Sequence, residues 1–253
     1  MGKIYFLLFF VLLIKLPATL VAHYDFNGNT NDAVYANNAI IYGSPQLTYD
    51  RFGNANSAYY FNGNGDYLRI ANSAHINFSL TQNFSVSFWV KPDNTQPTTV
   101  TSNMMLEKWS GTEGYPFVIR YFNQTSSKNG QVYGARWNGS SQSSVTSSVT
   151  INDGFFHHIA FIKNGNNVSL YVDGILEGTS TDLTSGDTTN TSDLYIACRG
   201  GASPYFFAGV IDDVQIYNHG LTFSEIQQIV PEISNIWMGM ICFLVVFLLK
   251  KRY

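Results

Sequence analysis

The chain has 253 residues, which is enough for one large domain with export and anchoring segments, so its length requires no second domain. Only 12% of the residues are charged, 15% are aromatic and 21 are glycines. This balance argues against a helical protein and is typical of many short strands joined by turns.

The first residues have the layout of an export signal. An apolar run over residues 4–14 follows a lysine and precedes Ala18 and Ala22, and it is too short to span a bilayer comfortably. We therefore predict a signal peptide over residues 1–22. Cleavage after Ala18 stays open because a leucine stands two residues before Ala22, and retention as a signal anchor stays open because a lysine interrupts the run.

Alternating side chains predict strands through the middle of the chain. The clearest strand covers residues 84–91, where Phe and Val alternate with Ser, Trp and Lys, as in a half-buried strand. Residues 158–163 and 168–173 are a predicted hairpin, because Asn-Gly-Asn-Asn joins them. Further strands are expected at residues 58–61, 67–70, 117–122, 131–137, 193–197 and 210–217. Strands this short and this closely spaced predict a two-sheet sandwich over residues 23–230.

The C-terminal part combines a short soluble helix with a predicted membrane anchor. Thr222 and Glu225 have the spacing of a capping box, which begins a helix. The apolar stretch 233–249 and the basic tail 250–253 predict one transmembrane helix with a cytoplasmic end. A buried core helix is the alternative, but residues 236–249 are apolar all round and carry no charge.

The predicted exported part is acidic. The terminal segments hold five of the 14 basic residues and one of the 17 acidic residues, which leaves a net charge of −7 for residues 23–230. Such a domain is a poor nucleic-acid binder, because neutralising phosphates needs clustered Lys and Arg, and it is better suited to binding cations. Of the two cysteines, Cys242 falls in the predicted span, so Cys198 has no partner for a disulfide within the domain.

Three sequence blocks carry a family resemblance. They are His23-Tyr-Asp-Phe-Asn-Gly-Asn29, the strand 84–92 with the segment 156–174, and the segment 207–226. In this order they resemble the laminin-G-like jelly-roll family of the concanavalin A-like superfamily. The resemblance implies an all-β fold of two antiparallel sheets in a jelly-roll sandwich. The apolar tail with its basic end is also similar to prokaryotic C-terminal sorting signals, which would imply cutting and reattachment at the surface.

The same resemblance implies a structural calcium ion where the two ends of the domain meet. The matching acidic positions are Asp25, Asp32 and the pair Asp212 and Asp213. Calcium binds six to eight oxygens, so two or three acids with Asn side chains and backbone carbonyls would suffice. Because side chains alternate along a strand, the paired aspartates are expected to face apart, with Asp213 as the main ligand. The alternative is that Asp25 and Asp32 only form turn hydrogen bonds.

Aromatic and arginine side chains offer a possible sugar site. Rings stack on sugar faces while Arg, Asn and Asp side chains form hydrogen bonds at their edges. Sandwich cores also absorb Trp and Tyr, so each residue could instead be a core residue. The candidates are Trp109, Tyr115, Arg120, Tyr121, Arg136, Trp137 and Tyr205.

These features predict a non-catalytic recognition or adhesion domain at the cell surface, which binds carbohydrate or an extracellular protein and is anchored through its C-terminal helix. A polysaccharide-active enzyme is the first alternative, but retaining hydrolysis needs paired carboxyls. Glu107 and Glu113 are isolated, and no Glu-x-Asp-x-Glu run exists in the chain. His157 and His158 are expected at the entry of a strand, one facing inward and one outward, where they pack or form strand-end hydrogen bonds. A purely structural surface protein is the second alternative.

Overall fold

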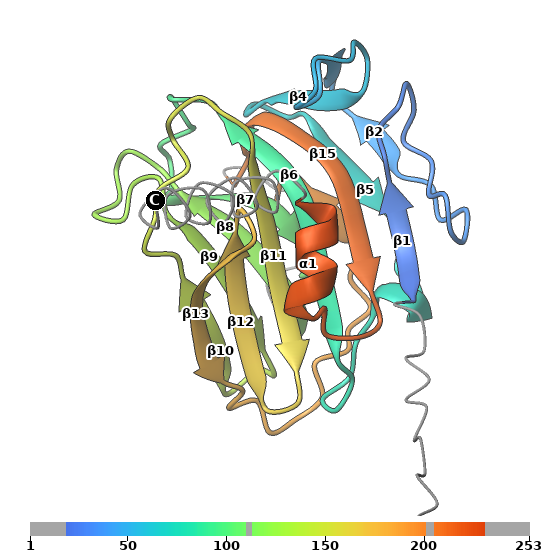
Figure 1. Ribbon diagram of the computed structural model, residues 1–253, viewed down its shortest axis with the longest axis vertical. Coiled ribbons are helices and arrows are strands. Elements are labelled where there is room, and N and C mark those ends of the chain that lie inside the picture. Colours follow the sequence, from blue (N-terminus) through green and yellow to red (C-terminus); the bar gives the residue numbers. More distant parts are fainter. Residues whose placement is uncertain (1–18, 110–112, 201–204, 231–253) are drawn as a thin grey trace, which may run out of the picture.

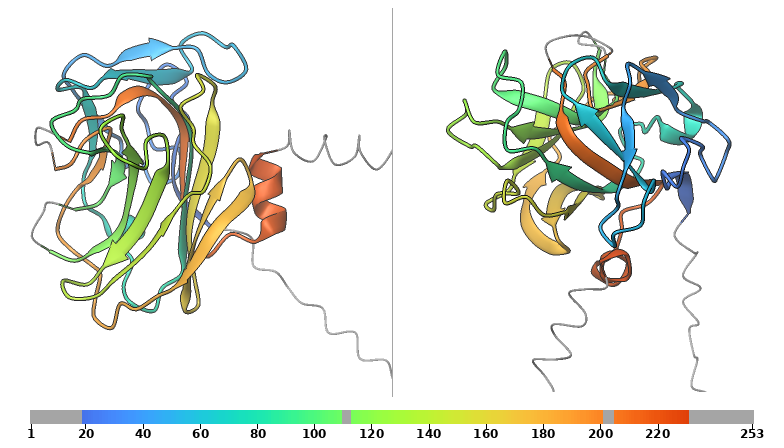
Figure 2. Two further views of the ribbon diagram at one scale, coloured as in Figure 1. Left: turned by 90° about the vertical axis from the view of Figure 1, so that its left-hand side faces the viewer. Right: turned by 90° about the horizontal axis from the view of Figure 1, so that it is seen from above.

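The alternating strands fold into two antiparallel sheets that lie face to face (Figures 1 and 2). The computed structural model describes residues 19–109, 113–200 and 205–230. The eight-stranded sheet contains, in spatial order, β13 (Ile175–Thr181), β12 (Asn167–Val172), β11 (His157–Asn164), β6 (Phe84–Pro92), β15 (Ala208–Tyr217), β4 (Ala58–Asn62) and β3 (Gln46–Thr48), and β1 (Leu20–Tyr24) also pairs with β15.

The seven-stranded sheet forms the other layer. Its order is β10 (Gln142–Thr146), β9 (Val132–Trp137), β8 (Tyr115–Phe122), β7 (Ser102–Glu107), β14 (Leu194–Ile196), β5 (Tyr67–Ile70) and β2 (Ile40–Tyr42). A 3-10 turn, η1 (Ala74–Ile76), and one helix, α1 (Phe223–Ile229), complete the described elements. The predicted two-sheet antiparallel sandwich is confirmed.

The core lies between the sheets and is built from every second residue of the strands. In β6, Phe84, Val86, Phe88 and Val90 all face it, as the alternation predicts. The Phe84 ring lies 5.8 Å from that of Phe117 in the opposite sheet. The outer face of β6 is also buried, so the strand is not half-buried as predicted. Side chains from neighbouring loops and from β11 cover it.

The helix α1 lies on the outside of the eight-stranded sheet (Figures 1 and 2). Its predicted capping box is present, since the Thr222 hydroxyl accepts a hydrogen bond from the Glu225 backbone N–H and the Glu225 carboxylate accepts one from the Thr222 backbone N–H. Ile226 is fully buried against Ala160 and Ile162 of β11. The helix therefore closes a second, smaller apolar cluster on this face.

The start of the domain and several strands differ from the sequence predictions. The first strand begins at Leu20, so Val21 and Ala22, which belong to the predicted signal peptide, are buried in the sandwich. Strands β2, β3, β7 and β13 are not predicted from the sequence, because β2 and β3 have three residues each, β7 has no β-branched residue and polar residues dominate β13. Residues 1–18 of the predicted signal peptide, the predicted anchor 233–249 and the tail 250–253 lie outside the described residues. Among the described helices, none combines the length and apolar character needed to cross a bilayer.

Gly134 lies at a close contact between the two sheets, where there is no room for a larger side chain. A Cβ added to Gly134 in β9 would lie 2.5 Å from Cδ2 of Phe161 in β11. We expect Gly134→Ala to lower the free energy of unfolding by about 1–3 kcal/mol, measured by urea denaturation, because overfilling a packed core forces side chains from their rotamers.

A double-mutant cycle with Phe161→Leu controls for general strand effects. Gly134→Ala should lower the free energy of unfolding much less in the Phe161→Leu protein than in the natural sequence, because the smaller leucine side chain leaves room for the added methyl group. Equal costs in both backgrounds would show that the clash is not the cause.

Candidate functional site

A cluster of aromatic rings lies on the outer face of the seven-stranded sheet, away from the core. In β8, Phe117 and Ile119 point into the core, so Val118 points outward, where it packs with Tyr115 and Ala135. Three larger rings, Trp109, Tyr133 and Trp137, pack against this small cluster. An open hollow of about 470 Å³ lies over it. We call this the aromatic–arginine hollow, lined by Trp109, Tyr115, Arg120, Trp137, Ser140, Gln142 and Arg199.

Three rings form the floor of the hollow. The centroid of Trp109 lies 5.2 Å from that of Tyr115 and 6.0 Å from that of Trp137, and the two Trp rings meet edge to face. Such tilted arrangements are favourable for aromatic pairs, and they hold each ring in one orientation. The Gln142 amide donates a 2.6 Å hydrogen bond to the Tyr115 hydroxyl. Burial raises the pKa of that hydroxyl to about 12, so it stays neutral.

A buried carboxylate holds two arginines beside the rings. Glu107 is fully buried, and its Oε1 accepts a 2.7 Å hydrogen bond from Nε of Arg199, while its Oε2 lies 3.7 Å from Nε of Arg120. Burial raises the pKa of Glu107, and the two arginines act against that shift. The Arg199 guanidinium lies 4.7 Å from the Trp109 ring centroid and 3.8 Å from that of Tyr205. Both arginines are thus fixed at the side of the hollow.

Buried hydrogen bonds hold the loop that carries Trp109 in place. Lys108 is fully buried and donates hydrogen bonds to Asn72, Asn190 and Ser192. Burial lowers the pKa of Lys108 to about 8, which is the cost of placing this amine inside. The Asn190 amide donates to the backbone oxygens of Lys108 and Gly114 on either side of the loop. These bonds point Lys108 inward and leave Trp109 on the outer face.

Buried polar atoms without partners lie beside the rings. Within the described residues, Nε1 of Trp109, Nε of Arg120 and Oε2 of Glu107 have no hydrogen-bond partner. Buried donors and acceptors are usually paired with protein groups or ordered water. Nε of Arg120 and Oε2 of Glu107 lie 3.7 Å from each other as an ion pair, and all three atoms are buried beneath the surface of the hollow.

The structure brings together most of the predicted sugar-binding residues. Trp109, Tyr115, Arg120 and Trp137 line one hollow, and Tyr205 stacks on Arg199 at its edge.

Arg136, another of the candidates, is fully buried and does not line the hollow. It neighbours the outward Trp137 on the same strand, so it must point inward. There its guanidinium donates a 2.7 Å hydrogen bond to the Thr188 hydroxyl and lies 3.3 Å from Asp182. Tyr121 also lies in the core, against Phe207.

The sequence analysis missed Arg199, Gln142 and Ser140 as lining residues. Each comes from a segment distant from Trp109 in the sequence, and no local pattern marks it. Only the pairing of β10 with β9, and of β14 with β7, brings these segments to the same face.

The family of the chain follows from a match over most of its length. The family model described as the concanavalin A-like lectin/glucanases superfamily matches residues 48–227. The chain belongs to this superfamily. No curated protein sequence matches the chain.

Solved structures of this superfamily fold share the architecture. Domain 4 of AbnA, an extracellular arabinanase from Geobacillus stearothermophilus solved in complex with arabinotriose, is 21% identical with a TM-score of 0.65, over 84% of this chain and 98% of that one. The binding domain of Paraclostridial Mosquitocidal Protein 1 is 16% identical with a TM-score of 0.69, over 83% of this chain and 51% of that one. The binding domain of Botulinum neurotoxin DC, in complex with rat synaptotagmin II, is 16% identical with a TM-score of 0.64, over 84% and 51%. The match spans about half the length of the two toxin domains, and at these identities it shows the fold alone.

The resemblance also predicts a calcium site. Two of its predicted acidic ligands, Asp25 and Asp32, already accept hydrogen bonds from other groups of the protein. Asp32 is buried, and its carboxylate accepts hydrogen bonds from the backbone N–H groups of His23, Val34, Tyr35 and Asn37. The Asp25 carboxylate accepts bonds from its neighbour two residues on, as in an Asx turn. Both aspartates thus form the turn contacts weighed as the alternative.

Asp212 and Asp213 do not face apart as predicted. A β-bulge with Asp213 at φ 50° interrupts the alternation of β15, and both carboxylates lie within 3.8 Å of Nη1 of Arg51. Asp213 also pairs with Nε2 of His23 at 2.8 Å. Burial raises the pKa of Asp212 to about 7, with a further contribution from Asp213.

These contacts do not fit a prepared calcium site. Within the described ranges, no three His, Cys, Asp or Glu side chains are grouped so that they could hold a metal ion. The acids at the two ends of the domain are joined instead by the His23–Asp213 pair, which ties β1 to β15. Calcium binding stays a prediction of the resemblance, and a titration tests it below.

The pH dependence of stability tests the His23–Asp213 pair. The hydrogen bond to Asp213 raises the pKa of His23, so its stabilisation is complete below pH 6.5 and is lost as pH rises through the higher folded value. Burial tends to raise the pKa of Asp213, but His23 and Gln215 lower it, so its contribution to stability is present above pH 3.8 and is lost as pH falls through the lower folded pKa. We expect Asp213→Asn to cost about 1–2 kcal/mol near pH 6 and less near pH 9, measured by urea denaturation.

Asp187→Asn is the matched control, because the Asp187 carboxylate bonds Thr189 and is not among the groups that shift the pKa of His23, so the stability difference between pH 6 and pH 9 should be unchanged. Adding millimolar calcium to the chelator-treated natural protein should not shift its melting temperature. A calcium-dependent rise that Asp213→Asn abolishes would instead support the predicted metal site.

Proposed function

We propose that this chain is a non-catalytic recognition domain that binds carbohydrate through the aromatic–arginine hollow. The observation that carries the proposal is the ring cluster of Trp109, Tyr115 and Trp137 on the outer face of a sheet whose inner face already forms the core. The core of the sandwich does not require aromatic rings on this outer face. Glu107 holds Arg120 and Arg199 beside the rings.

The chemistry of the hollow fits a sugar better than an apolar ligand. Its aromatic floor can stack on the C–H faces of sugar rings. Its rim holds the donors of Arg120, Arg199 and Gln142, which match hydroxyl or carboxylate oxygens. The open shape accommodates a chain that continues past the site. The arabinotriose complex of the arabinanase domain supports carbohydrate as the ligand class, and the synaptotagmin complex makes a protein partner the second outcome to test.

The lining does not support hydrolysis. The described residues that line the hollow include no Asp or Glu. Glu107 lies beneath the arginines and is bonded to Arg199, and Glu113 contacts the backbone N–H of Thr191. Retaining hydrolysis needs two carboxyls about 5 Å apart on either side of the bond, so a binding role is the better proposal.

We further propose that the domain stands outside the cell, tethered by residues 233–249, with the basic tail 250–253 inside. A cut after Ala22 would remove the first residues of β1, including the buried Val21. Cleavage after Ala18 leaves the strand whole. We expect N-terminal sequencing of the exported protein to begin at Thr19, and a start at His23 would contradict this.

Binding to an array of neutral and uronic-acid glycans tests the main proposal. We expect Trp137→Ala to lower the affinity for the tightest-binding glycan by roughly 30-fold, equivalent to about 2 kcal/mol, because it removes most of one stacking surface. Phe155→Ala is the control, since it removes an exposed aromatic ring from a loop on the opposite side of the sandwich. Far-UV circular dichroism and melting curves establish that both variants are folded.

Three outcomes would contradict the proposal. Glycan binding unchanged by Trp137→Ala would place the site elsewhere. Absence of any glycan ligand, together with a matrix protein that binds the natural chain and not the variant, would assign the hollow to protein recognition. Release of reducing sugar by the natural chain would make it an enzyme.

A further inference from the structure

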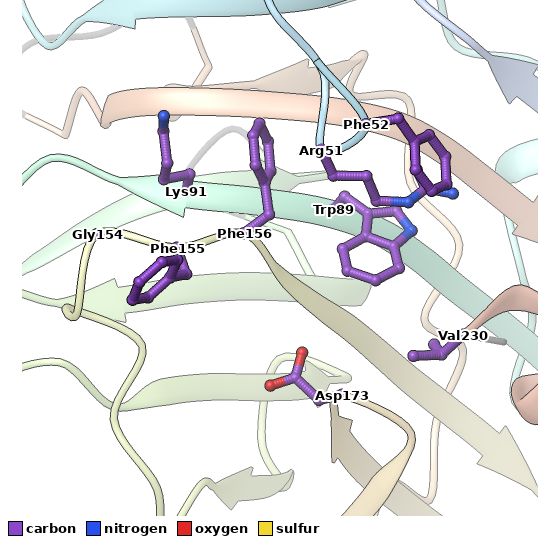
Figure 3. A pocket seen from close by; sticks show the side chains of 9 residues that line it. All are labelled: Arg51, Phe52, Trp89, Lys91, Gly154, Phe155, Phe156, Asp173 and Val230. Atoms are coloured by element: carbon purple, nitrogen blue, oxygen red, sulfur yellow. The ribbon is translucent and has the colours of Figure 1, made fainter. Parts of the chain in front are cut away.

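A second hollow lies on the opposite side of the sandwich, over the outer face of the eight-stranded sheet (Figure 3). It encloses about 640 Å³, and Trp89 of β6 lies at its floor. We call it the Trp89 hollow, and its walls include Arg51, Phe52, Lys91, Phe155 and Val230. Because the two sheets pack face to face, it points away from the aromatic–arginine hollow.

Two phenylalanines project from the walls into solvent. Phe52 is 62% exposed and Phe155 is 71% exposed. They come from different loops, between β3 and β4 and between β10 and β11, so their meeting at one hollow is not a local effect of the sequence. Large apolar side chains gathered at one place on a surface usually mark a contact site.

Both loops hold their phenylalanines in place. The Asp50 carboxylate accepts a 2.9 Å hydrogen bond from the Phe52 backbone N–H. The Asp153 carboxylate accepts a 3.0 Å bond from the Phe155 backbone N–H and contacts His157, which also bonds Asp173 at 2.7 Å. The exposed rings are therefore presented by ordered turns.

Basic side chains lie beside the rings. The Arg51 guanidinium lies between Phe52 and Trp89, at 4.2 and 4.3 Å from their centroids. Arg51 is also paired with Asp212 and Asp213, whereas Lys91 lies 5.2 Å from the Phe156 ring. Aromatic rings with nearby Lys or Arg are typical of the interface between a bilayer and water.

The chain leaves the sandwich at this same hollow. Val230 lines it, and the proposed tether 233–249 begins three residues later in the sequence. Three extended residues reach at most about 11 Å. If that stretch spans the bilayer, the Trp89 hollow lies within this distance of the membrane surface.

We propose that the Trp89 hollow rests on the lipid bilayer, with Phe52 and Phe155 inserted in the interfacial layer and Lys91 beside the lipid phosphates. The inference rests on the proposed membrane tether. It gives the domain a fixed orientation, because the face that carries the tether also contacts the lipid. The aromatic–arginine hollow then faces outward, where a ligand can reach it.

Depth-dependent fluorescence quenching of the full chain tests this orientation. Phe155→Cys is labelled with an environment-sensitive dye and inserted in phosphatidylcholine nanodiscs, with or without lipids that carry a nitroxide near the headgroup. Ser140→Cys, at the aromatic–arginine hollow, is the matched control. Both proteins also carry Cys198→Ala and Cys242→Ala, so that only one site is labelled.

We expect the nitroxide lipids to reduce emission at position 155 by about twofold or more and to leave emission at position 140 unchanged. Co-migration of the chain with the nanodiscs is measured first. A chain that does not enter the nanodiscs would overturn the tether and this orientation together. A chain that enters them with no quenching at position 155 would overturn the orientation alone. Emission at position 155 that responds to protein concentration and not to nitroxide lipid would assign the hollow to a second copy of the chain and reject the lipid contact.

Discussion

Strand β15 pairs on both of its edges and so holds the eight-stranded sheet together. One edge of this strand pairs with β6 along most of its length, while the other edge pairs first with β4 and then with β1. The bulge at Asp213 lies where the second edge changes partner, and there His23 of β1 reaches the carboxylate. One strand thus joins the two ends of the domain through protein contacts, and α1 follows it directly onto the outer face.

The sandwich separates two surfaces with different chemistry. The outer face of the seven-stranded sheet carries rings and arginines fixed by the buried Glu107, and the outer face of the eight-stranded sheet carries α1, the exit of the chain and the exposed Phe52 and Phe155. Because one layer of core separates them, a ligand on the first face and a membrane on the second would not compete. The proposed ligand binding and the proposed membrane contact could therefore take place on one domain at the same time.

The sequence predicted the parts that depend on local patterns. Alternation identified β6, the Asn-Gly turn identified the β11–β12 hairpin, and the capping box identified α1. It also named four residues of the aromatic–arginine hollow by type, but it could not exclude Arg136, because its inward direction depends on the register of β9. Arg199 could not be found, since only sheet pairing brings it to Trp109. The prediction that the Asp212 and Asp213 side chains face apart was wrong, because no local sequence signal marks the bulge.

The central claim is that this domain recognises its ligand on the outer face of the seven-stranded sheet. Hydrogen–deuterium exchange of the full chain in nanodiscs, with and without a bound glycan, tests it most directly. The account predicts slower exchange on glycan binding in β8, β9 and β10 and at the loop carrying Trp109, with no change at residues 50–53 and 153–156. Protection confined to those two loops, or to the turn around Asp32, would contradict it.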